Sequence, residues 1–133
     1  MADRTTITVN EEDAFNFVVR CLRENPASGY SYGYELYLPN VMRGYLESVL
    51  GITGIETDRA LPSVSPSFYA AAWELCRRGI LRPGIKAYRE QATEEGNAGN
   101  GYSVTPMGRE WLKQAGQYDY VPIEPGRFAK LLD

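Results

Sequence analysis

The sequence predicts a single α+β domain spanning residues 1–133. Several segments place apolar residues every three or four positions, which is the spacing of amphipathic helices. Others alternate apolar and polar residues, as strands do. Within residues 65–116 these signals follow the order helix, strand, glycine-rich loop, strand, helix. Because a chain of this length can bury a core of its own, we expect one domain and not two.

Composition excludes most kinds of catalytic and metal site. The chain has no histidine and only two cysteines, so it lacks the common nucleophile–base pairs and the donors of a usual zinc site. Its acidic residues fall on helix starts, polar faces and loop tips, and they do not cluster. We therefore expect no enzyme activity, no cofactor and no metal.

The apolar segments are too short for a membrane protein. No apolar run approaches the ~18–20 residues that a membrane span requires. The first six residues also lack the apolar segment of a signal peptide. We expect a cytoplasmic location and no membrane partner.

Residues 1–64 are expected to supply a short strand and two supporting helices. Residues 5–9 alternate in the manner of an edge strand. Asn10 is the predicted cap of the first helix, because acidic residues fill the following turn and suit the helix dipole. Pro26 marks the end of this helix.

A tyrosine-rich segment follows the first helix. Residues 28–38 alternate with period two, which predicts a strand that Pro39 ends. Its tyrosines have two interpretations: they cover the core with their hydroxyls in water, or they form an interface patch. Tyrosine is so often half-buried that the first interpretation is favoured. The candidate interface tyrosines are Tyr30, Tyr32 and Tyr34.

A long connector is expected between the second and third helices. Residues 40–50 predict the second helix, and Gly51 closes it. Residues 52–64 contain glycine and proline and predict an irregular connector. Ser65–Pro66 then predicts the start of the third helix, which Gly79 ends.

A hairpin and a fourth helix are expected next. After a turn at 82–84, residues 85–91 predict one strand, residues 93–101 a polar loop, and Tyr102 with Val104 the returning strand. Thr105–Pro106 opens a helix that ends at Gly116. Its predicted apolar face consists of Met107, Trp111, Leu112 and Ala115.

The end of the tail, residues 117–133, predicts a short amphipathic helix beginning at Pro125. Phe128, Leu131 and Leu132 on this helix require cover, either from their own domain or from a second chain.

Two sequence segments in residues 65–116 resemble the winged helix-turn-helix superfamily, in particular small bacterial winged-helix regulators. They are AWELCRRGIL at 72–81 and YSVTPMGREWL at 102–112. The resemblance implies a three-helix core, a β-hairpin wing, a further helix after the wing and a short C-terminal helix. It also implies DNA binding by the third helix in the major groove, with wing contacts to phosphate. The implied base-reading face is Ser63, Ser65, Ser67, Ala70, Glu74 and Arg77.

Charge decides what kind of DNA contact to expect. The net charge is −3, but residues 61–93 hold five basic and two acidic residues. Base readout prefers Arg, Lys, Asn and Gln, and the implied face offers mainly serine and alanine. We therefore expect contacts to the phosphate backbone of double-stranded DNA. The candidate nucleic-acid-binding residues are Ser65, Ser67, Arg77, Arg78, Arg82, Lys86 and Arg89.

A second hypothesis remains open beside DNA binding by a dimeric regulator. The same fold would serve as a protein–protein or assembly module that binds no DNA, with a different protein or a second copy as the partner. Its interface would be the tyrosine segment or the tail.

Overall fold

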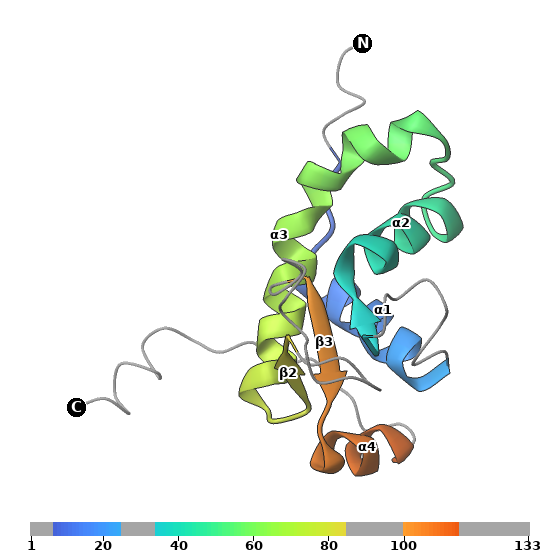
Figure 1. Ribbon diagram of the computed structural model, residues 1–133. Helices are drawn as coiled ribbons and strands as arrows, with labels where there is room; N and C mark the ends of the chain where they lie inside the picture. Colours follow the sequence, from blue (N-terminus) through green and yellow to red (C-terminus); the bar gives the residue numbers. More distant parts are fainter. Residues whose placement is uncertain (1–6, 25–33, 85–99, 115–133) are drawn as a thin grey trace, which may run out of the picture.

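The computed structural model describes residues 7–24, 34–84 and 100–114 (Figure 1). Within them, four helices and three short strands confirm the α+β class. The elements are, in chain order, α1 (Glu11–Glu24), β1 (Leu36–Tyr37), α2 (Leu38–Ser48), α3 (Ile55–Arg77), β2 (Leu81–Pro83), β3 (Gly101–Val104) and α4 (Pro106–Lys113).

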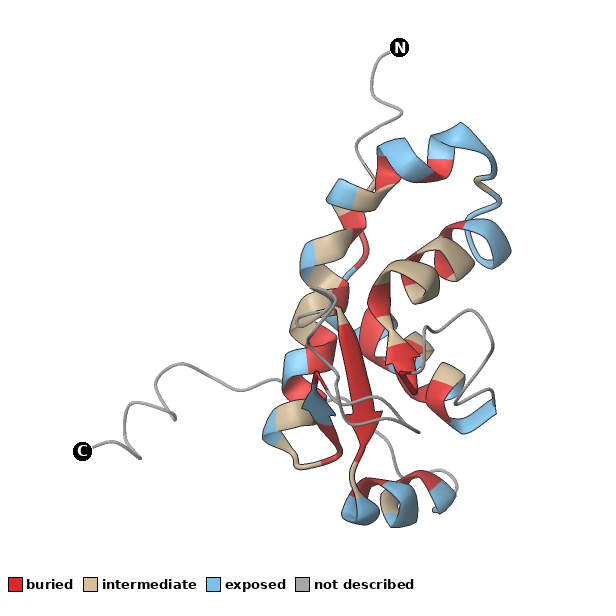
Figure 2. Ribbon diagram, in the orientation of Figure 1, coloured by how far each residue is buried: buried red, intermediate tan, exposed pale blue. Residues whose placement is uncertain are grey.

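The helix α3 is the element against which the others pack. Helices α1 and α2 lie along one side of it, and the strands lie beside its C-terminal half (Figure 1). The core fills the space between these elements (Figure 2). Phe17 on α1, Tyr45 on α2 and Phe68 on α3 meet there edge to face, with ring centroids 5.1–6.3 Å apart. The three helices therefore share one apolar core.

The sheet is antiparallel, with β3 between β1 and β2. Leu36 pairs with Tyr102 on one side of β3, and Leu81 pairs with Val104 on the other. Gly79 adopts a φ of 80° between α3 and β2, a conformation that glycine accepts most easily. The helix therefore ends before this glycine, as predicted, and the turn brings β2 back along the end of α3.

Two predicted helix starts are confirmed. The side chain of Asn10 accepts a hydrogen bond from the backbone N–H of Asp13 at 2.7 Å. The hydroxyl oxygen of Thr105 accepts one from the N–H of Gly108 at 2.9 Å. Each cap satisfies a backbone donor that has no partner inside its helix. The α4 helix ends at Lys113, and Met107 on its predicted apolar face is in fact exposed.

The predicted connector at residues 52–64 is wrong. Helix α3 already begins at Ile55, so Ser65 lies inside it, and the turn between α2 and α3 is short. Pro62 and Pro66 both lie within α3 on its exposed side. Burial of Ala60 and Val64 against the core extends the helix through both prolines, which local signals alone would place at a helix boundary.

The strand predicted at 28–38 is shorter than expected within the described residues. Pairing with β3 begins at Leu36, and the chain turns into α2 at Leu38, so Pro39 lies in the first turn of a helix. Similarly, the turn predicted at 82–84 contains part of strand β2. The strand predicted at 85–91, most of the loop at 93–101, much of the strand at 5–9 and the tail lie outside the described residues.

Candidate nucleic-acid interface

The outward face of α3 is the surface that a winged helix would present to DNA. The opposite face carries the core residues Ala60, Val64, Phe68, Ala71 and Leu75. At 100° per residue, the positions facing away from them are Arg59, Pro62, Pro66, Trp73 and Arg77. All five are exposed. Figure 2 shows exposed stretches of α3 on the side turned away from α1 and α2. This face holds two arginines but no lysine, asparagine or glutamine.

The two candidate serines have partners within the domain. The Ser65 hydroxyl donates to the backbone oxygen of Leu61 at 2.8 Å, one helical turn earlier. The Ser67 hydroxyl donates to the backbone oxygen of Val9, in the segment before α1. Both side chains are partly buried. These hydrogen bonds therefore stabilise the fold and use the hydroxyl donor that each serine would need to contact a base edge.

Arg77 and Arg78 are held by a buried carboxylate. Glu74, whose side chain is 6% exposed, accepts hydrogen bonds from Arg77 Nη2 and from Arg78 Nε, the latter at 2.8 Å. Arg78 also lies over the ring of Phe15, 4.9 Å from its centroid. Glu74 is thus not on an exposed base-reading face, which corrects the expectation. The cluster carries a net charge of +1, mainly on the half-exposed Arg77.

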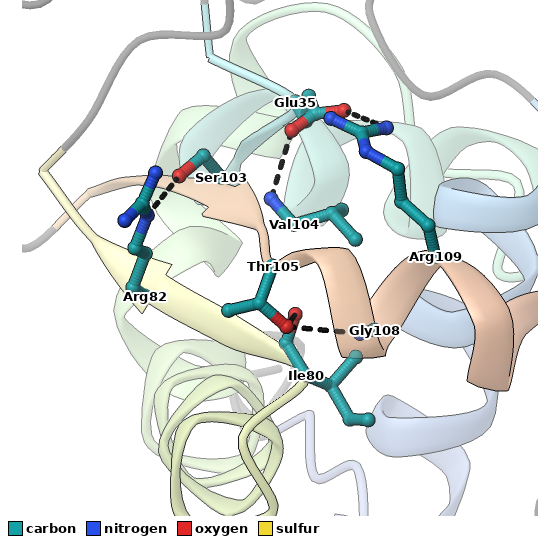
Figure 3. A network of polar contacts seen from close by, with 8 residues as sticks. All are labelled: Glu35, Ile80, Arg82, Ser103, Val104, Thr105, Gly108 and Arg109. Atoms are coloured by element: carbon teal, nitrogen blue, oxygen red, sulfur yellow. Dashed lines mark hydrogen bonds and ion pairs between the residues drawn. The ribbon is translucent and has the colours of Figure 1, made fainter.

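Arg82 extends the positive surface from α3 onto the sheet. It is exposed on β2, and its Nε lies 3.4 Å from the Ser103 hydroxyl on the neighbouring strand (Figure 3). This is a weak hydrogen bond, so the guanidinium keeps most of its donors for a ligand. Lys86 and Arg89, the other candidate wing cations, lie outside the described residues.

The N-terminal end of α3 adds charges that the sequence analysis missed. Arg59 is paired with Glu56 at 3.7 Å, and Arg43 of α2 with Asp58 at 2.6 Å. Arg43 is 43% exposed and the other three side chains are more than half exposed, so these pairs contribute little stability. The two acids cancel the two arginines at this end. Because the helix start was placed eleven residues too late, nothing in the sequence pattern assigned Glu56, Asp58 and Arg59 to α3.

Exposed apolar side chains were also missed. Trp73 is 51% exposed and Ile55 63%, and both lie on the outward face of α3. Val49 and Leu50 are exposed nearby, in the turn after α2. Of the predicted interface residues, Tyr34 is fully buried and stacks with Tyr37 at 6.1 Å, so it belongs to the core. The remaining predicted interface residues, Tyr30, Tyr32, Phe128, Leu131 and Leu132, lie outside the described residues.

Two of the described ionisable groups have strongly raised pKa values. Burial raises the pKa of the Cys76 thiol to about 11 and that of the Tyr102 hydroxyl to about 12. Both groups are therefore protonated at neutral pH and are weak nucleophiles. In the described ranges, no three of His, Cys, Asp and Glu are grouped so as to hold a metal. Nor is any helix in these ranges long and apolar enough to cross a bilayer.

Comparisons with protein-family models, with curated proteins and with solved structures found no significant match.

Proposed function

We propose that this chain is a non-enzymatic winged-helix module that binds double-stranded DNA chiefly through the phosphate backbone. The observation that supports this most strongly is the order α1–β1–α2–α3–β2–β3, in which a short turn joins α2 to α3. The corrected start of α3 removes the long connector that argued against a helix-turn-helix pose. The strand pair β2–β3 lies beside the C-terminal half of α3 (Figure 1), and this arrangement supports interpreting the pair as the base of a wing.

The proposed contact surface consists of Arg59 and Arg77 on the outward face of α3 and Arg82 on β2. Arginine is suited to phosphate because its donors match the phosphate oxygens in pairs. The face between Arg59 and Arg77 carries Pro62 and Pro66, which have no side-chain donor for a base edge. Binding with little sequence preference follows from this arrangement.

Salt dependence tests the proposal. If three arginines each neutralise one phosphate, the log–log slope of affinity against salt is about −2.7, and raising salt from 50 to 200 mM weakens binding about 40-fold. Fluorescence anisotropy with a random-sequence duplex measures this slope. Arg77→Glu with Arg82→Glu is expected to abolish binding. Arg77→Glu alone is expected to weaken it much more than Arg20→Glu, which makes the same charge change on α1. Absence of binding at 50 mM salt would reject DNA as the partner.

A second candidate function is a protein–protein contact module. It is supported by the exposure of Trp73 and Ile55, because protein–protein interfaces favour tryptophan and protein–DNA interfaces are more polar. A second copy of the chain is the partner to test first. Sedimentation equilibrium over a wide concentration range would then give a concentration-dependent mass, and Trp73→Ser would reduce it to that of the monomer. A constant monomer mass would reject self-association.

A further inference from the structure

We propose that the hollow between the C-terminal end of α1 and α4 binds a small amphipathic anion. This site is separate from the proposed DNA surface. Its volume is about 400 Å³, within the range of roughly 300–1,000 Å³ that small-molecule sites occupy. Its lining in the described part of the chain is Leu22, Arg23, Val104, Arg109, Leu112 and Lys113.

The floor of the hollow is apolar and comes from three elements. Leu22 lies on α1, Val104 at the end of β3, and Leu112 on α4, and each is buried against the core. Such a floor accepts an alkyl or aryl group, and apolar contact with it supplies binding free energy in proportion to the area removed from water. A ligand seated here touches α1, β3 and α4 together.

The rim of the hollow is cationic. Arg23 lies in the last turn of α1, Arg109 and Lys113 lie on α4, and no carboxylate lines the hollow among the described residues. Arg109 reaches from α4 past Val104 to Glu35, with Nη1 2.9 Å from a carboxylate oxygen (Figure 3). Its guanidinium has five N–H groups, so this ion pair leaves donors for a ligand.

The ion pair of Lys113, another of the three rim cations, is weak. Lys113 is 3.3 Å from Glu110, and both side chains are 72% exposed, so water competes strongly for this ion pair. A ligand carboxylate can take the place of Glu110 at little cost. Three cations around an aliphatic floor select a compound with an anionic head and an apolar body, such as a medium-chain or aryl carboxylate.

Decanoate and decylammonium form a matched pair of probes, because they share a ten-carbon chain and carry opposite charges. Isothermal titration with the full chain is expected to show saturable binding of decanoate, at least tenfold tighter than that of decylammonium. NMR is expected to show contacts between the decanoate chain and the methyl groups of Leu22, Val104 and Leu112. Decanoate is also expected to raise the Tm, because it binds the folded state.

Charge variants locate the head group. Arg23→Gln with Lys113→Gln is expected to weaken decanoate three- to tenfold and to leave decylammonium no weaker. Arg20→Gln with Arg59→Gln removes two exposed charges elsewhere and is expected to change neither. Circular dichroism checks that all variants fold. Equal affinity for the two probes, no saturable decanoate binding up to 1 mM, or methyl contacts elsewhere would overturn the proposal.

Discussion

Replacing Arg109 by glutamine is expected to destabilise the fold more than replacing its partner Glu35 by glutamine. Glu35 precedes β1, and its side chain is 6% exposed. One carboxylate oxygen accepts the backbone N–H of Val104 on β3 at 2.8 Å, and the other pairs with Arg109 of α4 at 2.9 Å (Figure 3). The carboxylate therefore joins β1, β3 and α4, and its cationic partner Arg109 lies on α4.

The asymmetry follows from exposure. In Glu35→Gln the amide oxygen still accepts the N–H of Val104, and water solvates Arg109, which is 55% exposed. The expected cost is at most ~1 kcal/mol, the value of a partly exposed ion pair. In Arg109→Gln a buried carboxylate loses its cation, and an under-satisfied buried charge costs about 2 kcal/mol. For a domain of this size these costs lower the Tm by up to ~4 °C and by about 6–8 °C respectively.

A double-mutant cycle measured by urea and thermal unfolding tests this reasoning. Once glutamine replaces Glu35, Arg109→Gln is expected to cost little more, which gives a coupling free energy of about 1–2 kcal/mol. Lys113→Gln is the matched control, because it breaks an exposed pair on the same helix and is expected to cost under ~0.5 kcal/mol. The reasoning is refuted if Arg109→Gln lowers the free energy of unfolding no more than Glu35→Gln does. It is also refuted if the effects of the two changes are additive, because a buried carboxylate that depends on Arg109 requires coupling.

Two further predictions concern glycine and cysteine. Gly44→Ala is expected to stabilise α2 by about 1 kcal/mol, because alanine favours a helix and a Cβ there meets no atom within 4 Å. Gly108→Ala is expected to destabilise the fold by about 1–3 kcal/mol, because its Cβ would overlap the carbonyl oxygen of Ile80. Urea unfolding of both variants tests this contrast. Burial raises the pKa of Cys76 from 9.0 to about 11, so the unfolded chain releases this proton first and stability is expected to fall between pH 9 and 11. Cys76→Ser is expected to remove that part of the pH dependence.

Local signals in the sequence predicted the ends of several helices correctly. Asn10, Thr105 and Gly79 act on backbone groups within a few residues of themselves. A cap hydrogen bond or a left-handed glycine therefore needs no information from the rest of the chain. The class of fold could also be predicted, because the order of helices and strands is a property of successive local segments.

The start of α3 could not be predicted in the same way. Pro62 and the pair Ser65–Pro66 are strong local boundary signals, and they favoured a break in the chain. They were overridden by contacts with distant residues, since Val64 packs in a core that α1 and α2 supply. Ser65 also directs its hydroxyl to Leu61 within the helix, where a cap was expected. Tertiary burial decides such a case, and a single sequence does not display it.

The late start also rotated the predicted buried face of α3. In residues 65–79 alone, the apolar spacing groups Trp73 with Phe68 and Leu75 and leaves Glu74 on the opposite face. The structure reverses both, with Trp73 half-exposed and Glu74 buried between two arginines. A shift of one residue along a helix turns the face by about 100°, enough to exchange a core position for a surface one. The candidate site was therefore less predictable than the fold.

The observed orientation of α3 determines which side chains its outward face presents to each proposed partner. With Ala60, Val64 and Phe68 fixed in the core, the outward face has arginines towards its two ends, with the prolines and Trp73 between them. A duplex would be attracted mainly to the end that carries Arg77, because Glu56 and Asp58 offset the arginines at the other end. It would find few donors along the rest of the face, which favours backbone contact over base readout. A protein surface would bury the apolar middle and leave the arginines at its rim. Trp73→Ser should therefore weaken protein association strongly and DNA binding little, whereas Arg77→Glu should do the opposite.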